Sequence, residues 1–128
     1  MEDTKKIVLL VDDDEFLLKM YAAKFTEKGF TVHTASQGDA ALSLLHDGLQ
    51  PDAILFDMVM PGMDGEKLLQ ALHEEKSIRG AKLVALSNQS DESVMDASKK
   101  IGVDAYIIKA NAVPSQIVEQ IVKLLSKN

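Results

Sequence analysis

Short apolar segments alternate with longer amphipathic segments along the whole chain. The apolar segments have the length of strands and span residues 7–11, 30–35, 53–56, 82–86 and 105–108. Nearly continuous hydrophobicity is typical of strands that are covered on both faces. Strand and helix repeated five times therefore predict an α/β fold, with a parallel sheet between two layers of helices.

Capping residues, glycine and proline mark the expected helix boundaries. Phe16, Met20 and Ala23, with Leu17, Tyr21 and Phe25, recur at helical spacing and predict a helix with a broad apolar face. Gly29 is the expected stop of that helix. The stretch 36–39, Ser-Gln-Gly-Asp, predicts a capping box before a helix over 40–45. The other boundary signals are caps at Asp64 and Ser90, a stop at Gly102 and a first helical turn at Pro114.

Length and composition indicate one ordinary globular domain over residues 1–128. The hydrophobic fraction is 46% and no apolar run approaches the roughly 18 residues of a spanning helix, so we expect a cytoplasmic protein without a membrane partner. The chain has no cysteine, which excludes disulfides and thiolate metal sites. A net charge of −6 without a basic stripe predicts no direct nucleic-acid partner.

Polar residues follow the apolar segments where the strands are expected to end. They are Asp12, Asp13 and Asp14 after the first segment, Asp57 after the third, Ser87 after the fourth and Lys109 after the fifth. The carboxyl ends of parallel strands share one edge of the sheet, and ligands bind at that edge. We therefore expect several carboxylates, a hydroxyl and an ammonium to meet there.

This combination suits phosphoryl transfer to a carboxylate. Two acidic strand ends repel each other unless a cation lies between them, and Mg²⁺ prefers such oxygen ligands. Asp13 and Asp57 are the expected direct ligands, with Asp12 bound directly or through water. Asp57 would be the nucleophile, Lys109 would neutralise charge on the phosphoryl group, and Ser87 would donate a hydrogen bond to it.

Each residue also has a simpler explanation. Asp14 is most simply an N-cap, Ser87 a turn residue and Lys109 a solvated strand end. Tyr106 is most simply half-buried packing with its hydroxyl at the surface. The methionines at 58, 60 and 63 and the histidines at 33, 46 and 73 are interpreted as packing or surface residues, because none has metal-ligand spacing.

Taken together, the motifs resemble those of response regulator receiver domains. The matching stretches are 11–14 (Val-Asp-Asp-Asp), 57–65 (Asp-Met-Val-Met-Pro-Gly-Met-Asp-Gly), Ser87 and 107–109 (Ile-Ile-Lys), which cover essentially the whole chain. The resemblance implies a flavodoxin-like, doubly wound sheet of five parallel strands in the order 2-1-3-4-5, with five helices.

The resemblance also implies a role for each site residue. Asp57 would accept a phosphoryl group from a histidine kinase or a histidine phosphotransfer protein, assisted by Ser87 and Lys109. Asp12, Asp13, Asp57 and the backbone carbonyl of Val59 would bind Mg²⁺. Ser87 and Tyr106 would form the switch that changes a partner-binding face made by the fourth helix, the fifth strand and the fifth helix. The protein would be a phosphoacceptor rather than an enzyme.

Two positions depart from the pattern of that family. Ala110 follows Lys109 where the family usually has proline, which predicts a differently shaped loop over 110–113. Asn88 follows Ser87 where the family often has a smaller residue, which predicts an altered rate of dephosphorylation.

Two other functions stay open at this point. One is a receiver-like binding scaffold that is never phosphorylated. The other is a phosphatase of the haloacid dehalogenase type, in which Asp12 rather than Asp57 would be the nucleophile.

Overall fold

The structure is a computed structural model that describes residues 6–58, 65–75, 78, 80–87, 92–109 and 113–126. The side chains of residues 92–94 and 97 are not described either. Several expectations fall outside this part of the chain. They concern the Val59 carbonyl, the caps at Asp64 and Ser90, and the effects of Asn88 and Ala110.

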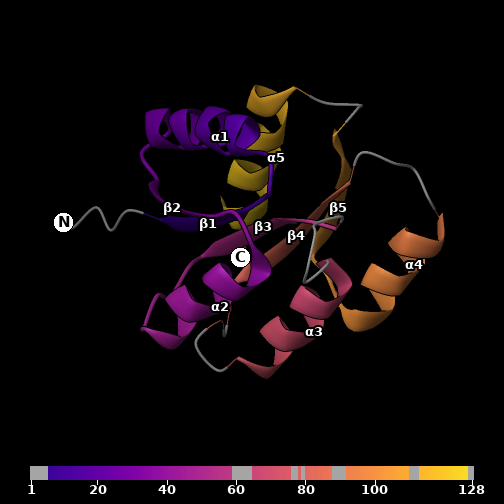
Figure 1. Cartoon of the computed structure of the whole chain (residues 1–128). Helices are drawn as coiled ribbons and strands as arrows, with labels where there is room; N and C mark the ends of the chain where they lie inside the picture. Colours follow the sequence, from indigo (N-terminus) through magenta and orange to yellow (C-terminus); the bar gives the residue numbers. More distant parts are fainter. Residues whose placement is uncertain are drawn as a thin grey trace.

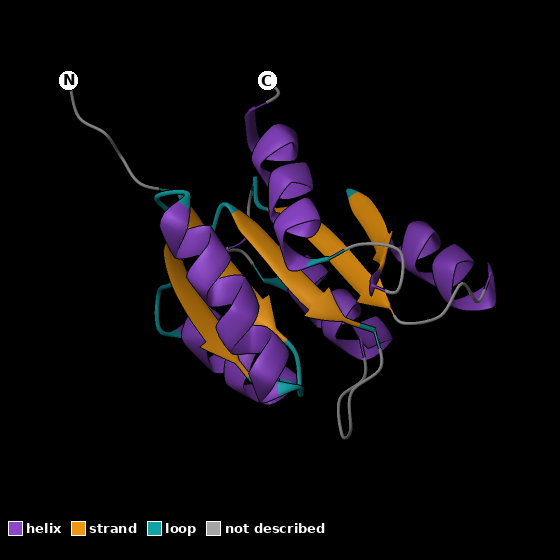
Figure 2. Ribbon diagram, turned by 90° about the horizontal axis from the view of Figure 1, so that it is seen from above, coloured by secondary structure: helices purple, strands orange, loops and turns teal. Residues whose placement is uncertain are grey.

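Five parallel strands form one sheet in the order β2-β1-β3-β4-β5, which confirms the implied topology. The strands are β1 (Ile7–Val11), β2 (Thr31–Ala35), β3 (Ala53–Asp57), β4 (Lys82–Ser87) and β5 (Ala105–Ile108). Figure 2 shows their arrowheads pointing toward the same edge of the sheet. The register pairs Val11 with Phe56 and Asp57 with Leu86, so the acidic strand ends lie close together at that edge.

Helices cover both faces of the sheet, as the strand composition predicts. They are α1 (Glu15–Glu27), α2 (Gly38–His46), α3 (Gly65–Glu74), α4 (Glu92–Ile101) and α5 (Pro114–Ser126). Figure 1 shows α1 and α5 on one side and α2, α3 and α4 on the other. Within the described ranges, no helix is long and apolar enough to cross a membrane.

The sheet separates two hydrophobic cores, because successive side chains of a strand point to opposite faces. The core beneath α1 and α5 contains Leu10, Leu55 and Ile107 from the strands, and we call this side the α1/α5 face. The core beneath the other helices contains Val11, Phe56 and Ala85 from the same sheet, and we call that side the α2–α4 face. Continuous apolar strands are thus explained by burial on both sides.

Most of the predicted strand boundaries are correct to within one residue. The strand expected over 30–35 begins at Thr31, and those expected over 53–56 and 82–86 extend by one residue. The two extensions include Asp57 and Ser87. These two polar side chains are therefore held by the ladder of the sheet and not by a loop.

Two predictions from the helix signals are wrong: Phe16, which was expected on the apolar face of α1, is 71% exposed, and one expected cap is not formed. Asp14 is the N-cap of α1 and its side chain accepts a hydrogen bond from the Leu17 amide, as the simpler explanation proposed. The expected capping box at 36–39 is not formed, because α2 begins at Gly38 with Gln37 as an N-cap that makes no side-chain hydrogen bond. That start leaves Ser36 one residue too early for the box.

Glycine and proline do end and begin helices where expected. Gly29 and Gly102 have φ angles of 92° and 116°, a left-handed conformation that glycine adopts readily after a helix. Pro114 is the first residue of α5, where its missing amide hydrogen is not needed.

Candidate functional site

The alternation of side chains along the strands brings three charged residues to the same face. Asp12, Asp57 and Lys109 each follow by two positions a residue of the α1/α5 core, namely Leu10, Leu55 and Ile107. A step of two residues returns the side chain to the same side of a sheet. The three charged groups therefore lie on the α1/α5 face at the carboxyl edge, above an apolar floor.

Lys109 joins the two acidic strand ends. Its Nζ atom lies 2.7 Å from Oδ2 of Asp12 and 3.1 Å from Oδ2 of Asp57. The side chains of Lys109 and Asp57 are each 7% exposed and that of Asp12 is 2% exposed. The simpler reading of Lys109 as a solvated strand end is therefore wrong. We call these three residues the ion triad.

Asp12 is held through both carboxylate oxygens. Oδ2 accepts the hydrogen bond from Lys109, and Oδ1 accepts one from the Asp14 amide at 2.9 Å. The backbone of Asp12 is tied to the neighbouring strand, because its amide donates to the Ala35 carbonyl at 3.1 Å. Asp12 is thus oriented before any ligand arrives.

The environment keeps Lys109 charged. Burial by itself would lower the pKa of this ammonium, but the hydrogen bond to Asp12 and the charges of Asp57 and Asp12 outweigh it, and the pKa is raised. A permanent positive charge next to Asp57 is suited to binding an incoming anion.

Three carboxylates at this edge fit a divalent cation. One oxygen each from Asp12, Asp13 and Asp57 lies within 4.8 Å of the others. Asp13 is exposed, whereas Asp12 and Asp57 are buried, so the group opens to solvent on the Asp13 side. Three negative charges against the single charge of Lys109 leave an excess that a hard cation with oxygen ligands would balance. The residues present therefore fit Mg²⁺.

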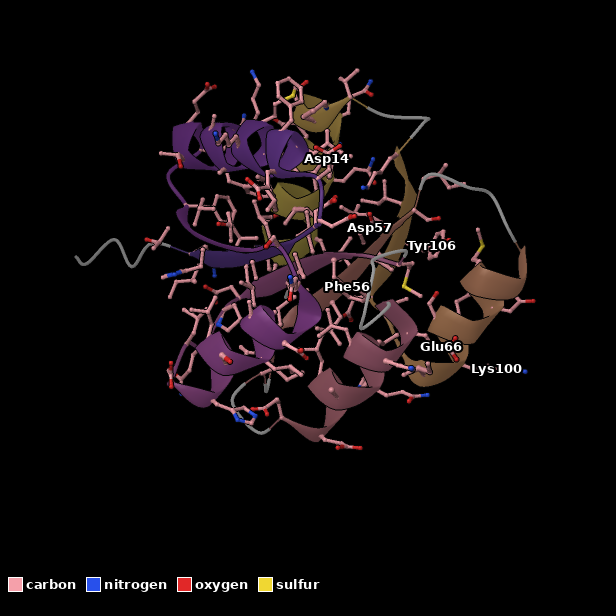
Figure 3. The ribbon with its side chains drawn as sticks, in the orientation of Figure 1. Asp14, Phe56, Asp57, Glu66, Lys100 and Tyr106 are labelled. Atoms are coloured by element: carbon pink, nitrogen blue, oxygen red, sulfur yellow. The ribbon has the colours of Figure 1, made fainter. Side chains whose placement is uncertain are left out.

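Ser87 and Tyr106 lie on the opposite face of the sheet from the ion triad. Ser87 follows Ala85 of the α2–α4 core by two positions, and Tyr106 packs against that same core. Ser87 is 1% exposed. Figure 3 shows Asp57 and Tyr106 toward the same end of the sheet, with Asp14 at the start of α1.

The hydroxyl of Tyr106 is not at the surface, which corrects the simpler reading. The oxygen is buried and has no hydrogen-bond partner among the described residues. A buried hydroxyl without a partner costs about 1–3 kcal/mol.

A close backbone contact fixes the chain just after Asp57. The Gly65 amide donates to the Met58 carbonyl at 3.0 Å, and the Met58 amide donates to the Leu86 carbonyl at 2.8 Å. A β-carbon on residue 65 would lie 2.4 Å from the Met58 α-carbon and 2.8 Å from the Asp57 carbonyl oxygen. Only glycine fits at this point, where α3 begins.

Some interactions could not be anticipated from sequence. His46 is paired with Glu75 just after α3, and His73 is hydrogen-bonded at 2.8 Å to the carbonyl of Gly102 just after α4. Tyr21 was expected only on an apolar helix face, yet it lies in the electrostatic field of the ion triad. An aromatic residue two turns after an acidic strand end is the only signal for it in the sequence.

The chain is similar to known response regulators in sequence. A sequence model of the response regulator receiver domain matches residues 8–122. The protein named "Probable transcriptional regulator ycf27" from Guillardia theta is 32% identical over 107 residues, which cover 84% of this chain and 41% of that protein. "DNA-binding response regulator MtrA" from Mycolicibacterium smegmatis is 27% identical over 128 residues, which cover all of this chain and 54% of that protein. The chain thus spans about half the length of these curated relatives.

The comparison corrects one expectation. We predicted that the chain has no nucleic-acid partner, and this is wrong, because the MtrA relative is named as DNA-binding. The prediction rested on the net charge of −6. Net charge reports the non-specific attraction of these 128 residues to nucleic acid, and it carries no information on a DNA-binding function to which a receiver is coupled.

Solved structures agree with the fold. The response regulator receiver domain protein (CheY-like) from Methanospirillum hungatei JF-1 superposes with a TM-score of 0.86 at 27% identity, covering 95% of this chain and 94% of that chain. The shared topology is the doubly wound sheet described above. With the family model matching residues 8–122, these findings show that the chain belongs to the response regulator receiver domain family of two-component signalling.

Proposed function

We propose that this domain accepts a phosphoryl group on Asp57 from a phosphohistidine donor. The observation that carries the proposal is the position of Lys109, whose ammonium contacts Asp57 at 3.1 Å and Asp12 at 2.7 Å while all three side chains are almost fully buried. A carboxylate with a fixed cation beside it, at the open edge of a sheet, is suited to attack on a phosphoryl group.

In the transfer step a carboxylate oxygen of Asp57 attacks the phosphorus atom. The bond between phosphorus and the imidazole nitrogen of the donor breaks, its electron pair returns to the nitrogen, and the product is an acyl phosphate. The Lys109 ammonium, paired at first with the Asp57 carboxylate, would then neutralise the negative charge on the phosphoryl oxygens. Water attacking the same phosphorus would later restore the carboxylate and release inorganic phosphate, which ends the signal.

Asp12, Asp13 and Asp57 would hold Mg²⁺ for this step, together with the Val59 carbonyl, which lies outside the described residues. Bound Mg²⁺ supplies positive charge against the oxygens of the phosphoryl group. The exposed side of the cluster, at Asp13, leaves room for water and phosphoryl ligands, which Mg²⁺ usually keeps.

Ser87 and Tyr106 would transmit the change to the other face of the sheet. Ser87 is buried next to Asp57 in the register, since Asp57 pairs with Leu86. Its hydroxyl would donate to a phosphoryl oxygen. In this proposal the Tyr106 side chain has two positions, and a new contact at Ser87 changes their populations; the buried hydroxyl without a partner among the described residues supports it.

The test is intact-protein mass spectrometry after incubation with phosphoramidate and Mg²⁺. We expect a gain of one phosphoryl group that is absent in Asp57→Asn and retained in Asp47→Asn, which changes an exposed carboxylate at the end of α2. No gain in the wild-type protein would contradict the proposal and favour the binding scaffold. Hydrolysis of phosphomonoesters that survives Asp57→Asn would favour the phosphatase.

We propose, as a second function, that the state of Asp57 controls DNA binding. The support is the name of the MtrA relative, which matches this chain over its full length. The test is retention of the protein, expressed from its own gene, on immobilised genomic DNA with and without phosphoramidate. Retention should change with phosphoramidate in the wild-type protein and stay constant in Asp57→Asn. Equal behaviour of the two proteins would exclude control through Asp57.

A further inference from the structure

Tyr21 is a buried tyrosine in the core on the side of the sheet that carries the ion triad. It lies in the middle of α1 and is 3% exposed. It belongs to the α1/α5 core with Leu10, Leu55 and Ile107. Each of these strand residues precedes a member of the ion triad by two positions, so Tyr21 packs in the layer that supports Asp12, Asp57 and Lys109.

The charges of the ion triad also act on the phenol of Tyr21. Burial raises the pKa of Tyr21, and among the charged groups Lys109 has the largest influence, in the opposite direction. The carboxylates of Asp12, Asp57 and Asp14 act on the phenol as well. Of these four groups, three form the ion triad and the fourth caps α1.

Lys109 needs support from the protein beyond its two hydrogen bonds. A lysine side chain has four rotatable bonds, and fixing it costs up to about 2 kcal/mol of conformational entropy. Its ammonium also contacts Asp57, the group that changes its charge and position during phosphoryl transfer. We expect the long stem to be held by packing on the α1/α5 face, where Tyr21 is the buried aromatic side chain of α1 closest to the site in sequence, since Phe16 is 71% exposed.

We propose that Tyr21 is a positioning residue, whose ring packs beside the stem of Lys109 and keeps the ammonium at Asp57 during transfer. This inference rests on the proposed phosphoacceptor function. Tyr21 does not touch the phosphoryl group and acts only through Lys109. In this proposal the aromatic ring acts by packing, and the hydroxyl group is not required.

The first measurement is the rate of phosphorylation by phosphoramidate. We expect Tyr21→Leu to lower the rate on the order of tenfold, because a displaced cation contributes less to the transition state. Tyr21→Phe keeps the ring and should remain within about twofold of the wild-type protein. Phe25→Leu is the matched control, since Phe25 is a fully buried aromatic residue one turn further along α1 in the same core. It should leave the rate unchanged.

The second measurement is Mg²⁺ binding by calorimetry, which separates positioning from general damage. A loosened Lys109 competes less for the carboxylates, so Tyr21→Leu should bind Mg²⁺ roughly two- to fivefold more tightly. General damage to the site would weaken binding. In a Lys109→Met background Tyr21→Leu should have no further effect on Mg²⁺ binding, because the lysine through which Tyr21 acts is absent.

The outcomes distinguish this inference from the proposed function. If the wild-type protein gains no phosphoryl group, the proposed function fails. If the wild-type protein is phosphorylated and Tyr21→Leu reacts at the same rate, only the positioning role fails. Three further outcomes would overturn the positioning role. Tyr21→Leu could bind Mg²⁺ more weakly than the wild-type protein, or it could have the same effect with Lys109→Met as without it. Tyr21→Phe could also lose as much of the phosphorylation rate as Tyr21→Leu.

Discussion

Lys109 and Asp12 are 97 residues apart in the sequence, and a 2.7 Å hydrogen bond joins their side chains. Their strands are not neighbours, because β3 and β4 lie between β1 and β5 in the sheet. The lysine side chain therefore reaches across the carboxyl edge, over Asp57. This contact makes the ammonium part of the acidic site, where it pairs with Asp12 and Asp57 at the same time.

Replacing Lys109 should separate metal binding from phosphoryl transfer. In Lys109→Met we expect the rate of phosphorylation by phosphoramidate to fall by about 10²–10³, the usual loss for one preorganised electrostatic group. Mg²⁺ should bind more tightly, because a competing cation has been removed from Asp12 and Asp57. Mass spectrometry and calorimetry measure the two effects. Lys19→Met, at an exposed position of α1, should match the wild-type protein in both.

Removing one carboxylate of the cluster should stabilise the metal-free protein. Asp13 is exposed, and it adds a negative charge next to Asp12 and Asp57. In Asp13→Asn we expect a higher urea midpoint without metal, because repulsion is reduced. Added Mg²⁺ should raise the free energy of unfolding of the wild-type protein by about 2.7 kcal/mol at a hundredfold excess over Kd, and should hardly affect that of the variant. Equal stabilisation of the two proteins by Mg²⁺ would exclude Asp13 as a ligand.

The stability of the protein should decrease at alkaline pH. The pKa of Lys109 is raised above its ordinary value of 10.5, and that of Tyr21 is raised above its ordinary value of 10.0. The folded state then keeps protons that the unfolded state has lost, so this part of the stability is complete below about pH 10 and disappears as the pH rises through the folded pKa values.

Urea titrations between about pH 8 and 12 should show this decrease. The slope should be shallower in Tyr21→Phe, which lacks the phenol, and also in Lys109→Met. Lys19→Met should keep the wild-type slope, since its ammonium is exposed on α1. A wild-type slope in both site variants would show that neither group is linked to folding.

A methyl group at position 65 should disturb Asp57 through the backbone. In Gly65→Ala the new carbon would lie 2.4 Å from the Met58 α-carbon, so the backbone after Asp57 must move. We expect a loss of about 1–3 kcal/mol in the free energy of unfolding and slower phosphorylation. Gly29→Asn is the control, because Gly29 has a positive φ and no atom within 4 Å of an added β-carbon. It should leave phosphorylation unchanged.

Much of the fold was predictable because its signals are local. Five apolar segments gave five strands, and Gly29, Gly102 and Pro114 marked helix ends where expected. The prediction of a capping box at 36–39 was wrong because a local signal of this kind can be too weak to fix a helix start. Ser-x-x-Asp is a weak local preference, and α2 begins at Gly38 without it.

The sequence by itself determined which residues lie at the carboxyl edge. The apolar segments locate the strands along the chain, and the polar residues that follow each segment can be read directly. Tertiary structure alone decided how those residues face one another. The two-residue alternation places Asp12, Asp57 and Lys109 over the α1/α5 core, and places Ser87 and Tyr106 on the other side. Burial then made Lys109 part of an internal ion pair, and the described part of the chain offers the buried Tyr106 hydroxyl no partner. These outcomes depend on contacts between segments far apart in the chain, which no local pattern specifies.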